Sequence, residues 1–203
     1  MEQTNNKTEK PLSYYRQEFA RNDPEEMSAR SGVRYEDGVF HTLYFSRPVS
    51  VSWPDMKMAY EDDPDAEVAS YIQILLARLI IYSVAAPDTG KFLSYQEVPW
   101  GAHYFKAFKG RCIDRLAGTY GSRPEAFKED ATRIGAAGIS GGDASVEAQI
   151  FPGLKIRATI WQGDDEFPAA AQILFSDNFL VAFTAEDMAA VGDLFINALK
   201  GRW

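Results

Sequence analysis

The chain has 203 residues, of which 46% are hydrophobic and 25% are charged, a composition typical of a globular protein. Its formal net charge is −8, and a negative field repels phosphate backbones, which argues against nucleic acid as the main partner. The single cysteine, Cys112, excludes a disulfide or an iron–sulfur cluster within one chain, and two histidines exclude a histidine-rich metal site.

The N-terminal part is predicted to be a tail followed by short helices. Residues 1–10 are polar and lack the apolar segment of a secretory signal, so we expect a disordered tail and a cytoplasmic protein. The next two segments, LSYYRQEFAR and DPEEMSARSG, predict two short helices. Asp23 fits the N-cap of the second helix, and Gly32 fits its end.

Strands and a long apolar helix are predicted next. Asp37-Gly38 separates two strand-like runs and indicates a two-residue hairpin, and the alternation over 48–53 indicates a third strand. After an acidic turn over 60–67, the segment 66–84 is apolar on most of its circumference, which is typical of a central core helix. Its central Arg78 would be costly in lipid, so we predict a buried helix and no membrane association.

The segment HYFKAFKGRCIDRLAG, residues 103–118, predicts a helix with basic residues beside an apolar sector. The candidate ligand-binding residues, suited to a carboxylate or a phosphate, are His103, Lys106, Lys109, Arg111 and Arg115. Lys109 falls inside the apolar sector, so its ammonium group either reaches water beyond the sector or is buried and ion-paired. Cys112 lies in the same sector and is expected to be a buried structural thiol, because His103 lies on another face of the helix.

The last third of the chain gives the clearest strand signal. It follows a shorter helix within 122–138 and a glycine-rich loop. Four segments are predicted to be strands: 144–150, 154–161, 169–176 and 179–183. The first two are joined by FPG and the last two by Asp177-Asn178. TAED, residues 184–187, predicts the start of a final helix.

Acidic residues gather at one end of the predicted sheet. The connection after the strand 154–161 holds three consecutive acids, and the hairpin register places Asp143 beside it. The predicted turn at Asp177-Asn178 brings Asp187 to the same end. Carboxylates are hard ligands for a divalent cation such as Mg²⁺ or Ca²⁺. The candidate metal ligands are Asp143, Asp164, Asp165 and Glu166. The alternative is a solvated loop, since GDDEFP lacks the ligand spacing of a calcium-binding EF-hand loop.

Five segments of the chain are similar to those of a known family. They are GKFLSYQEVPWG, YFKAFKGRCIDRLAGTYG, GDASVEAQIFP, IWQGDDEFPAAAQILF and TAEDMAAVGDLFINAL. Through them the chain resembles, over roughly residues 40–200, a prokaryotic family known as domain of unknown function 3786. The resemblance implies a cytoplasmic protein of an anaerobe and supplies no catalytic residue. Some members of that family carry an added cysteine-rich iron–sulfur segment, which this sequence lacks.

Together these patterns predict one α+β domain over residues 11–203. In it, an antiparallel sheet built from the C-terminal strands and the hairpin near Asp37-Gly38 packs against the apolar helix 66–84. The leading functional hypothesis is a ligand- or partner-binding accessory protein in a redox or one-carbon context. The alternative is a small enzyme or a divalent-cation-binding protein that uses the acidic end of the sheet with the basic helix. A third hypothesis is a purely structural or interaction domain, for which an exposed apolar patch would be the sign.

Overall fold

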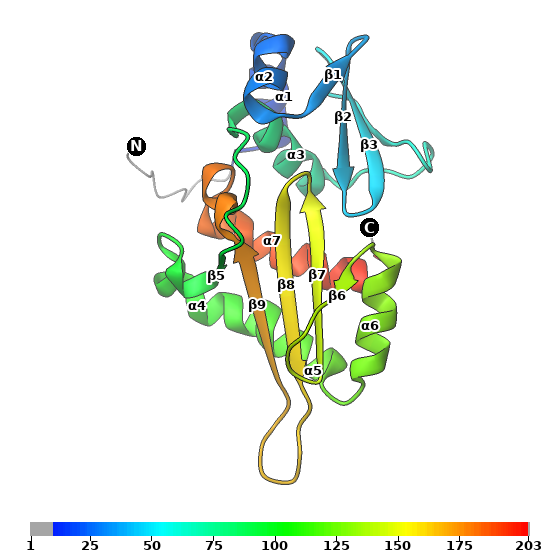
Figure 1. The fold of residues 1–203 in the computed structure, drawn as a ribbon. Helices are drawn as coiled ribbons and strands as arrows, with labels where there is room; N and C mark the ends of the chain where they lie inside the picture. The colour runs from blue at the N-terminus through cyan, green and yellow to red at the C-terminus, as the bar shows by residue number, and fades with distance from the viewer. Residues whose placement is uncertain (1–9, 203) are drawn as a thin grey trace.

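The computed structural model describes residues 10–202, so nearly all of the predicted tail lies outside the described residues. Within that range the chain forms α-helices and two antiparallel sheets, which confirms the predicted α+β class (Figure 1). The predicted strands are divided between these sheets and do not form one. The N-terminal strands form the small sheet, in the order β1-β2-β3-β4, and the other strands form the large sheet, in the order β5-β9-β8-β7-β6.

The N-terminal lobe comprises the small sheet and the helices that precede and follow it. Its elements are α1 (Leu12–Arg21), α2 (Pro24–Ser31), β1 (Arg34–Glu36), β2 (Val39–Tyr44), β3 (Arg47–Ser52), β4 (Met58–Tyr60) and α3 (Ser70–Tyr82). As predicted, the carboxylate of Asp23 caps α2 by accepting a hydrogen bond from the Glu26 N–H (3.0 Å), and Gly32 ends the helix with φ of 73°. Asp37 and Gly38 form the hairpin turn between β1 and β2, both with positive φ.

The C-terminal lobe comprises the large sheet and its helices. Its elements are β5 (Phe92–Ser94), the 3₁₀ helix η1 (Tyr95–Glu97), α4 (Gly101–Phe108), the π-helical turn η2 (Lys109–Ile113), α5 (Asp114–Tyr120), α6 (Pro124–Arg133), β6 (Ala137–Gly138), β7 (Ala144–Phe151), β8 (Leu154–Trp161), β9 (Ala170–Ser176), the 3₁₀ helix η3 (Asp177–Val181) and α7 (Ala185–Leu199). The predicted β7–β8 hairpin and its FPG turn are confirmed.

The prediction of a strand over 179–183 is wrong, because this segment lies in and just after η3. Phe179 and Phe183 are both buried, and the Phe183 N–H donates to the Phe179 carbonyl (2.8 Å). A four-residue spacing suits a helical turn, and a short apolar run alone does not distinguish a helical turn from a strand. The chain therefore passes from β9 through η3 to α7, with no strand between them.

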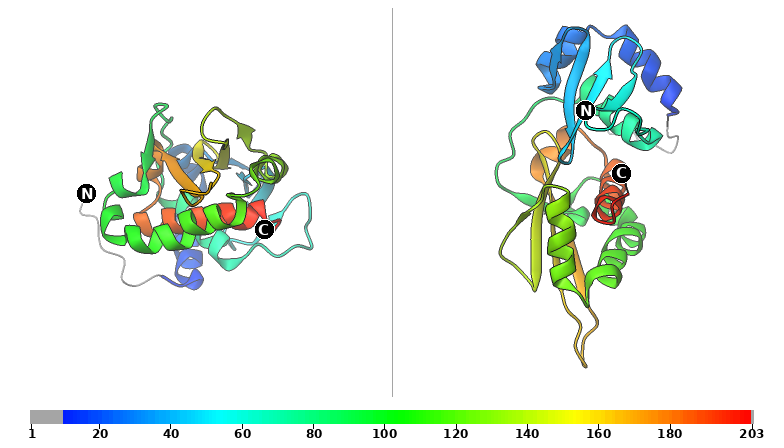
Figure 2. Two further views of the ribbon diagram at one scale, coloured as in Figure 1. Left: turned by 90° about the horizontal axis from the view of Figure 1, so that it is seen from below. Right: turned by 90° about the vertical axis from the view of Figure 1, so that its right-hand side faces the viewer.

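The large sheet has one covered face and one polar face. Along β8, Leu154, Ile156, Ala158 and Ile160 are buried, whereas the residues between them are partly exposed. Helix α7 and the α4–η2–α5 segment lie together on the buried side (Figure 2). This arrangement explains the strict alternation in the sequence, because only one side of each strand contacts the helices.

The two lobes share one hydrophobic core. The Phe45 N–H of the N-terminal lobe donates to the Ile150 carbonyl of β7 (2.9 Å), and the rings of Tyr44 and Phe151 lie 6.1 Å apart. Helix α3 is buried on most sides, as predicted, and its Arg78 forms an ion pair with Asp187 of α7 (2.7 Å). Among residues 10–202, no helix combines the length and the apolar character needed to cross a membrane.

Candidate functional site

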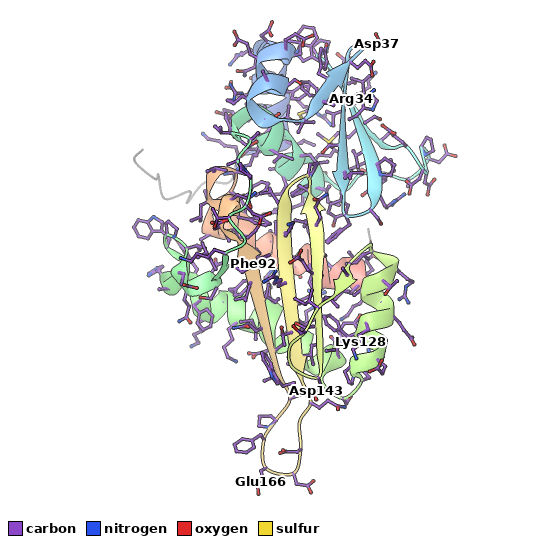
Figure 3. All side chains as sticks on the ribbon, viewed as in Figure 1. Arg34, Asp37, Phe92, Lys128, Asp143 and Glu166 are labelled. Carbon is purple, nitrogen blue, oxygen red and sulfur yellow. The ribbon has the colours of Figure 1, made fainter. Side chains whose placement is uncertain are left out.

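The predicted acidic residues lie along an arm that projects from the large sheet. The arm is the connection 162–169 between β8 and β9, with Asp143 at its base and Glu166 at its tip (Figure 3). The Asp143 N–H donates to the Ile160 carbonyl (2.9 Å), and the Asp143 carboxylate accepts a hydrogen bond from the Gln162 N–H (2.7 Å). The prediction that Asp143 lies at the same end of the sheet as the three consecutive acids is therefore confirmed.

The prediction that Asp187 joins these acids is wrong. Because η3 replaces the predicted strand, α7 begins at the opposite end of β9 from the arm (Figure 1). There the Asp187 carboxylate is almost fully buried. It accepts hydrogen bonds from the N–H and the hydroxyl of Thr184 (both 2.8 Å) and pairs with Arg78. Asp187 therefore caps α7 and connects it to α3.

The acids of the arm shape its turn. The Asp164 carboxylate accepts hydrogen bonds from the N–H groups of Phe167 (2.7 Å) and Glu166 (2.9 Å), and these bonds hold its pKa below the ordinary value. Within residues 10–202, no group of three or more His, Cys, Asp or Glu side chains is placed to hold a metal ion. A cation site at Asp143, Asp164, Asp165 and Glu166 thus stays a prediction, whereas the turn gives Asp164 a structural role.

The predicted basic helix is interrupted by η2. A π turn contains an extra residue, so it rotates the following side chains relative to a regular α-helix. Lys109 is the first residue of this turn. It lies outside the apolar sector, with 52% of its side chain exposed, and forms an ion pair with the exposed Asp114. The expectation that Lys109 faces the core is therefore wrong, and its ion pair is a surface contact.

The predicted ligand-binding residues do not converge on one point. Arg111 contacts the carboxylate of Asp193 on α7 (3.1 Å), and Arg115 contacts the same carboxylate and the side-chain oxygen of Asn197. His103 and Lys106 are exposed on α4, two or more helical turns before Arg115. The two arginines therefore hold α7 against the α4–η2–α5 segment, and only this part of the predicted set is a cluster.

Cys112 is a buried structural thiol, as predicted. Its Sγ contacts the Ala189 carbonyl (3.4 Å), and burial raises the pKa of the thiol to about 12. Gly192 of α7 lies directly opposite, where an added Cβ would be 3.0 Å from the Cys112 Sγ. The thiol therefore marks a close approach of two helices, and it is protonated at neutral pH.

We expect Cys112 to be unreactive toward a thiol reagent such as dithiobisnitrobenzoate in the native protein at pH 8. The reagent reacts with an accessible thiolate. The raised pKa of Cys112 keeps the thiol protonated, and its burial keeps the reagent away. One thiol equivalent should react after denaturation in guanidinium. Ser122→Cys, at an exposed position, is the control and should react at once with one equivalent. Rapid labelling of native Cys112 would contradict this assignment.

A pocket that was not predicted from the sequence lies where the two lobes meet. Its cavity volume is about 330 Å³. It is lined by the end of α2, the end of α3, the connecting segment 83–87, the β7–β8 turn and η3. Two exposed valines, Val84 and Val181, form part of its wall, and Tyr82 and Leu180 beside them in the chain are also exposed. We call this cavity the junction pocket.

The walls of the junction pocket are fixed by hydrogen bonds. The side-chain amide of Asn178 donates to the carbonyls of Ala86 and Gly153 (both 2.9 Å) and thereby joins the connecting segment to the β7–β8 turn. Asp177 accepts hydrogen bonds from the hydroxyl (2.5 Å) and the N–H (3.1 Å) of Thr89, and these bonds lower its pKa. The contribution of Asp177 to stability is therefore present above the unfolded-state pKa and is lost as the pH falls through the lowered folded-state value.

The chemistry of the junction pocket favours binding over catalysis. None of the described residues that line it carries an ionisable side chain, so its walls supply no general acid or base, and the hydroxyls of Ser31 and Ser83 have no base among them to activate a nucleophile. They supply apolar surface and backbone carbonyls, which suits an apolar group with a polar end. The strand alternation and the apolar helix faces in the sequence did not indicate this pocket, because its lining comes from helix ends and connections.

Comparisons with known proteins place this geometry within one family. The sequence model described as "Domain of unknown function (DUF3786)" matches residues 23–198. The matched range includes most of both lobes, without α1, and all of the junction pocket and the arm. A search of curated proteins and a search of solved structures found no match. The comparisons thus give the chain a family, and its function has to be argued from the geometry.

Proposed function

We propose that this chain, which belongs to the DUF3786 family, is a binding protein that holds an apolar group of its ligand in the junction pocket. The observation that carries the proposal is a cavity of about 330 Å³ at the meeting of two lobes, bordered by exposed valines. In this proposal the protein works in the cytoplasm of an anaerobic prokaryote, the setting that its sequence resemblance implies. We propose further that it is an accessory to a redox or one-carbon system.

The size of the junction pocket limits what it can hold. Ligand pockets commonly measure roughly 300–1,000 Å³, so this cavity suits one ring or a short alkyl chain, such as the apolar end of a metabolite. Burying such a group is favourable by about 0.8 kcal/mol for each methylene removed from water. Both amide donors of Asn178 are already used by carbonyls, so Asn178 positions the walls and has no amide N–H left for the ligand.

The exposed apolar side chains around the junction pocket support the same proposal. Val84 is 54% exposed and Val181 is 46% exposed, and Tyr82 and Leu180 beside them are exposed as well. Apolar side chains that gather around a cavity commonly mark a binding surface. A catalytic role would need ionisable groups at the junction pocket. The acidic and basic residues of the alternative enzyme hypothesis lie instead on the arm and on α4–α5.

A thermal-shift screen of small apolar compounds tests the proposal. We expect at least one indole, benzoate or short-chain fatty acid to raise the melting temperature, because binding to the native state stabilises it by mass action. Ala182→Phe, which fills the junction pocket, should abolish that shift. The matched control is Ala107→Phe, at an exposed position on α4, and it should keep the full shift. An equal shift in both variants, or no shift with any compound, would refute the proposal.

A further inference from the structure

Arg115, near the start of α5, and the two basic residues that follow α7 are all bonded to Asn197. The Asn197 side-chain oxygen accepts a hydrogen bond from Arg115, and its backbone carbonyl accepts hydrogen bonds from the N–H groups of Lys200 and Arg202 (both 3.0 Å). The Gly201 N–H donates to the Ala198 carbonyl (2.9 Å), and Gly201 has φ of 71°. This left-handed turn closes α7 and directs the chain back toward Asn197.

A fourth cation, Arg123, lies between α5 and α6. The Arg123 guanidinium donates to the Thr119 carbonyl (2.8 Å), and the Thr119 hydroxyl donates to the Arg115 carbonyl (2.7 Å). Arg115, the second residue of α5, and Arg123, just after α5, are thus connected through Thr119. We call Arg115, Arg123, Lys200 and Arg202 the basic cluster.

Most of the basic cluster has no carboxylate partner within residues 10–202. Among the residues that the structure describes, Arg123, Lys200 and Arg202 form no ion pair, and the partner of Arg115, Asp193, is shared with Arg111. Burial lowers the pKa of Lys200, and repulsion from Arg115, Arg202 and Arg123 lowers it further. This repulsion is a cost to the native state that a bound anion would relieve.

The helix dipole explains only part of this arrangement. Cations near a helix C-terminus are stabilised by the carbonyls there, which accounts for a lysine or an arginine just after α7. It does not require a second helix to bring two more arginines to the same place, in a chain whose net charge is −8. Elsewhere the basic side chains commonly have a carboxylate within 4 Å, for example Arg47 with Asp62 and Lys155 with Asp88.

We propose that the basic cluster is a binding site for a doubly charged oxyanion, the chemistry of a phosphate monoester group. Guanidinium groups present paired N–H donors that match phosphate oxygens, and Lys200 adds a mobile point charge. A dianion suits the cluster because it offsets two of the unpaired cations at once. The site is separate from the junction pocket, whose lining contains none of these residues.

Isothermal titration with inorganic phosphate, at constant ionic strength and with the whole chain, tests the proposal. We expect saturable binding to the wild type, and at least tenfold weaker binding to Lys200→Met/Arg202→Gln. The control is Arg16→Gln/Lys91→Met, which removes two exposed cations elsewhere and should bind phosphate like the wild type. Because Lys200 is the C-cap of α7, its substitution can destabilise the fold, so the melting temperature of each variant is measured without phosphate. Arg123→Gln is a second test, which leaves α7 unchanged.

The outcomes separate a real site from general charge attraction. Equal weakening in the site variant and the control would overturn the proposal, since it would show only the effect of net charge. The proposal would also be overturned if phosphate binding to the wild type did not saturate, or if it were less than about tenfold tighter than chloride binding at the same ionic strength. Acetate should bind at least tenfold more weakly than phosphate, and equal binding of acetate would overturn the preference for a dianion.

Discussion

Replacing Asp187 with alanine is expected to lower the free energy of unfolding by about 3–5 kcal/mol, one of the largest effects of any single substitution in this chain. The Asp187 side chain is 4% exposed and that of its partner Arg78 is 17% exposed. Removing the carboxylate leaves the guanidinium in an apolar helix without its counter-charge. It also removes the two hydrogen bonds from Thr184 that begin α7. Equilibrium unfolding in urea measures the loss.

Two further variants separate these contributions. Thr184→Ala affects only the cap of α7 and should cost about 0.5–2 kcal/mol. Arg78→Met keeps the cap, leaves Asp187 buried without its cation and should cost more than Thr184→Ala. The matched control, Asp165→Ala at the exposed tip of the arm, should change stability by less than about 0.5 kcal/mol. If Asp187→Ala proved no more destabilising than the control, the ion pair would not join the lobes.

Leu75→Ala and Leu76→Ala are each expected to cost about 2–5 kcal/mol of unfolding free energy. Both side chains are fully buried in α3, and both belong to the core that the two lobes share. Each substitution therefore removes apolar contacts and leaves a cavity that the surrounding helices cannot close completely. Denaturant unfolding, followed by circular dichroism, gives the magnitude.

Leu180→Ala is the matched control for these substitutions. Leu180 is 38% exposed in η3, so the same chemical change should cost less than about 1 kcal/mol. The core variants should also unfold in a single transition, because the lobes share one core. Losses below about 1 kcal/mol at both Leu75 and Leu76 would show that α3 is not the central helix of the fold.

The sequence alone determined those elements whose signals are local. The alternation over β7 and β8, the turn at Asp37-Gly38 and the capping of α2 by Asp23 all depend on residues a few positions apart. The apolar circumference of α3 also predicted its burial. These features were correct because backbone geometry, caps and the side on which a residue lies follow from neighbouring residues.

The tertiary structure decided everything that depends on which distant segments meet. The segment FLVAF forms the end of η3 and the residues after it, and not a strand, because Phe179 and Phe183 are both buried in the core. Asp187 therefore lies beside Arg78, at the end of the sheet opposite the arm. Lys109, the first residue of the π turn, is exposed to solvent, and Asp193 of α7 pairs with Arg111 and Arg115. The junction pocket and the basic cluster are likewise built from segments far apart in the chain. Their formation depends on long-range packing, which no periodicity within a short window encodes.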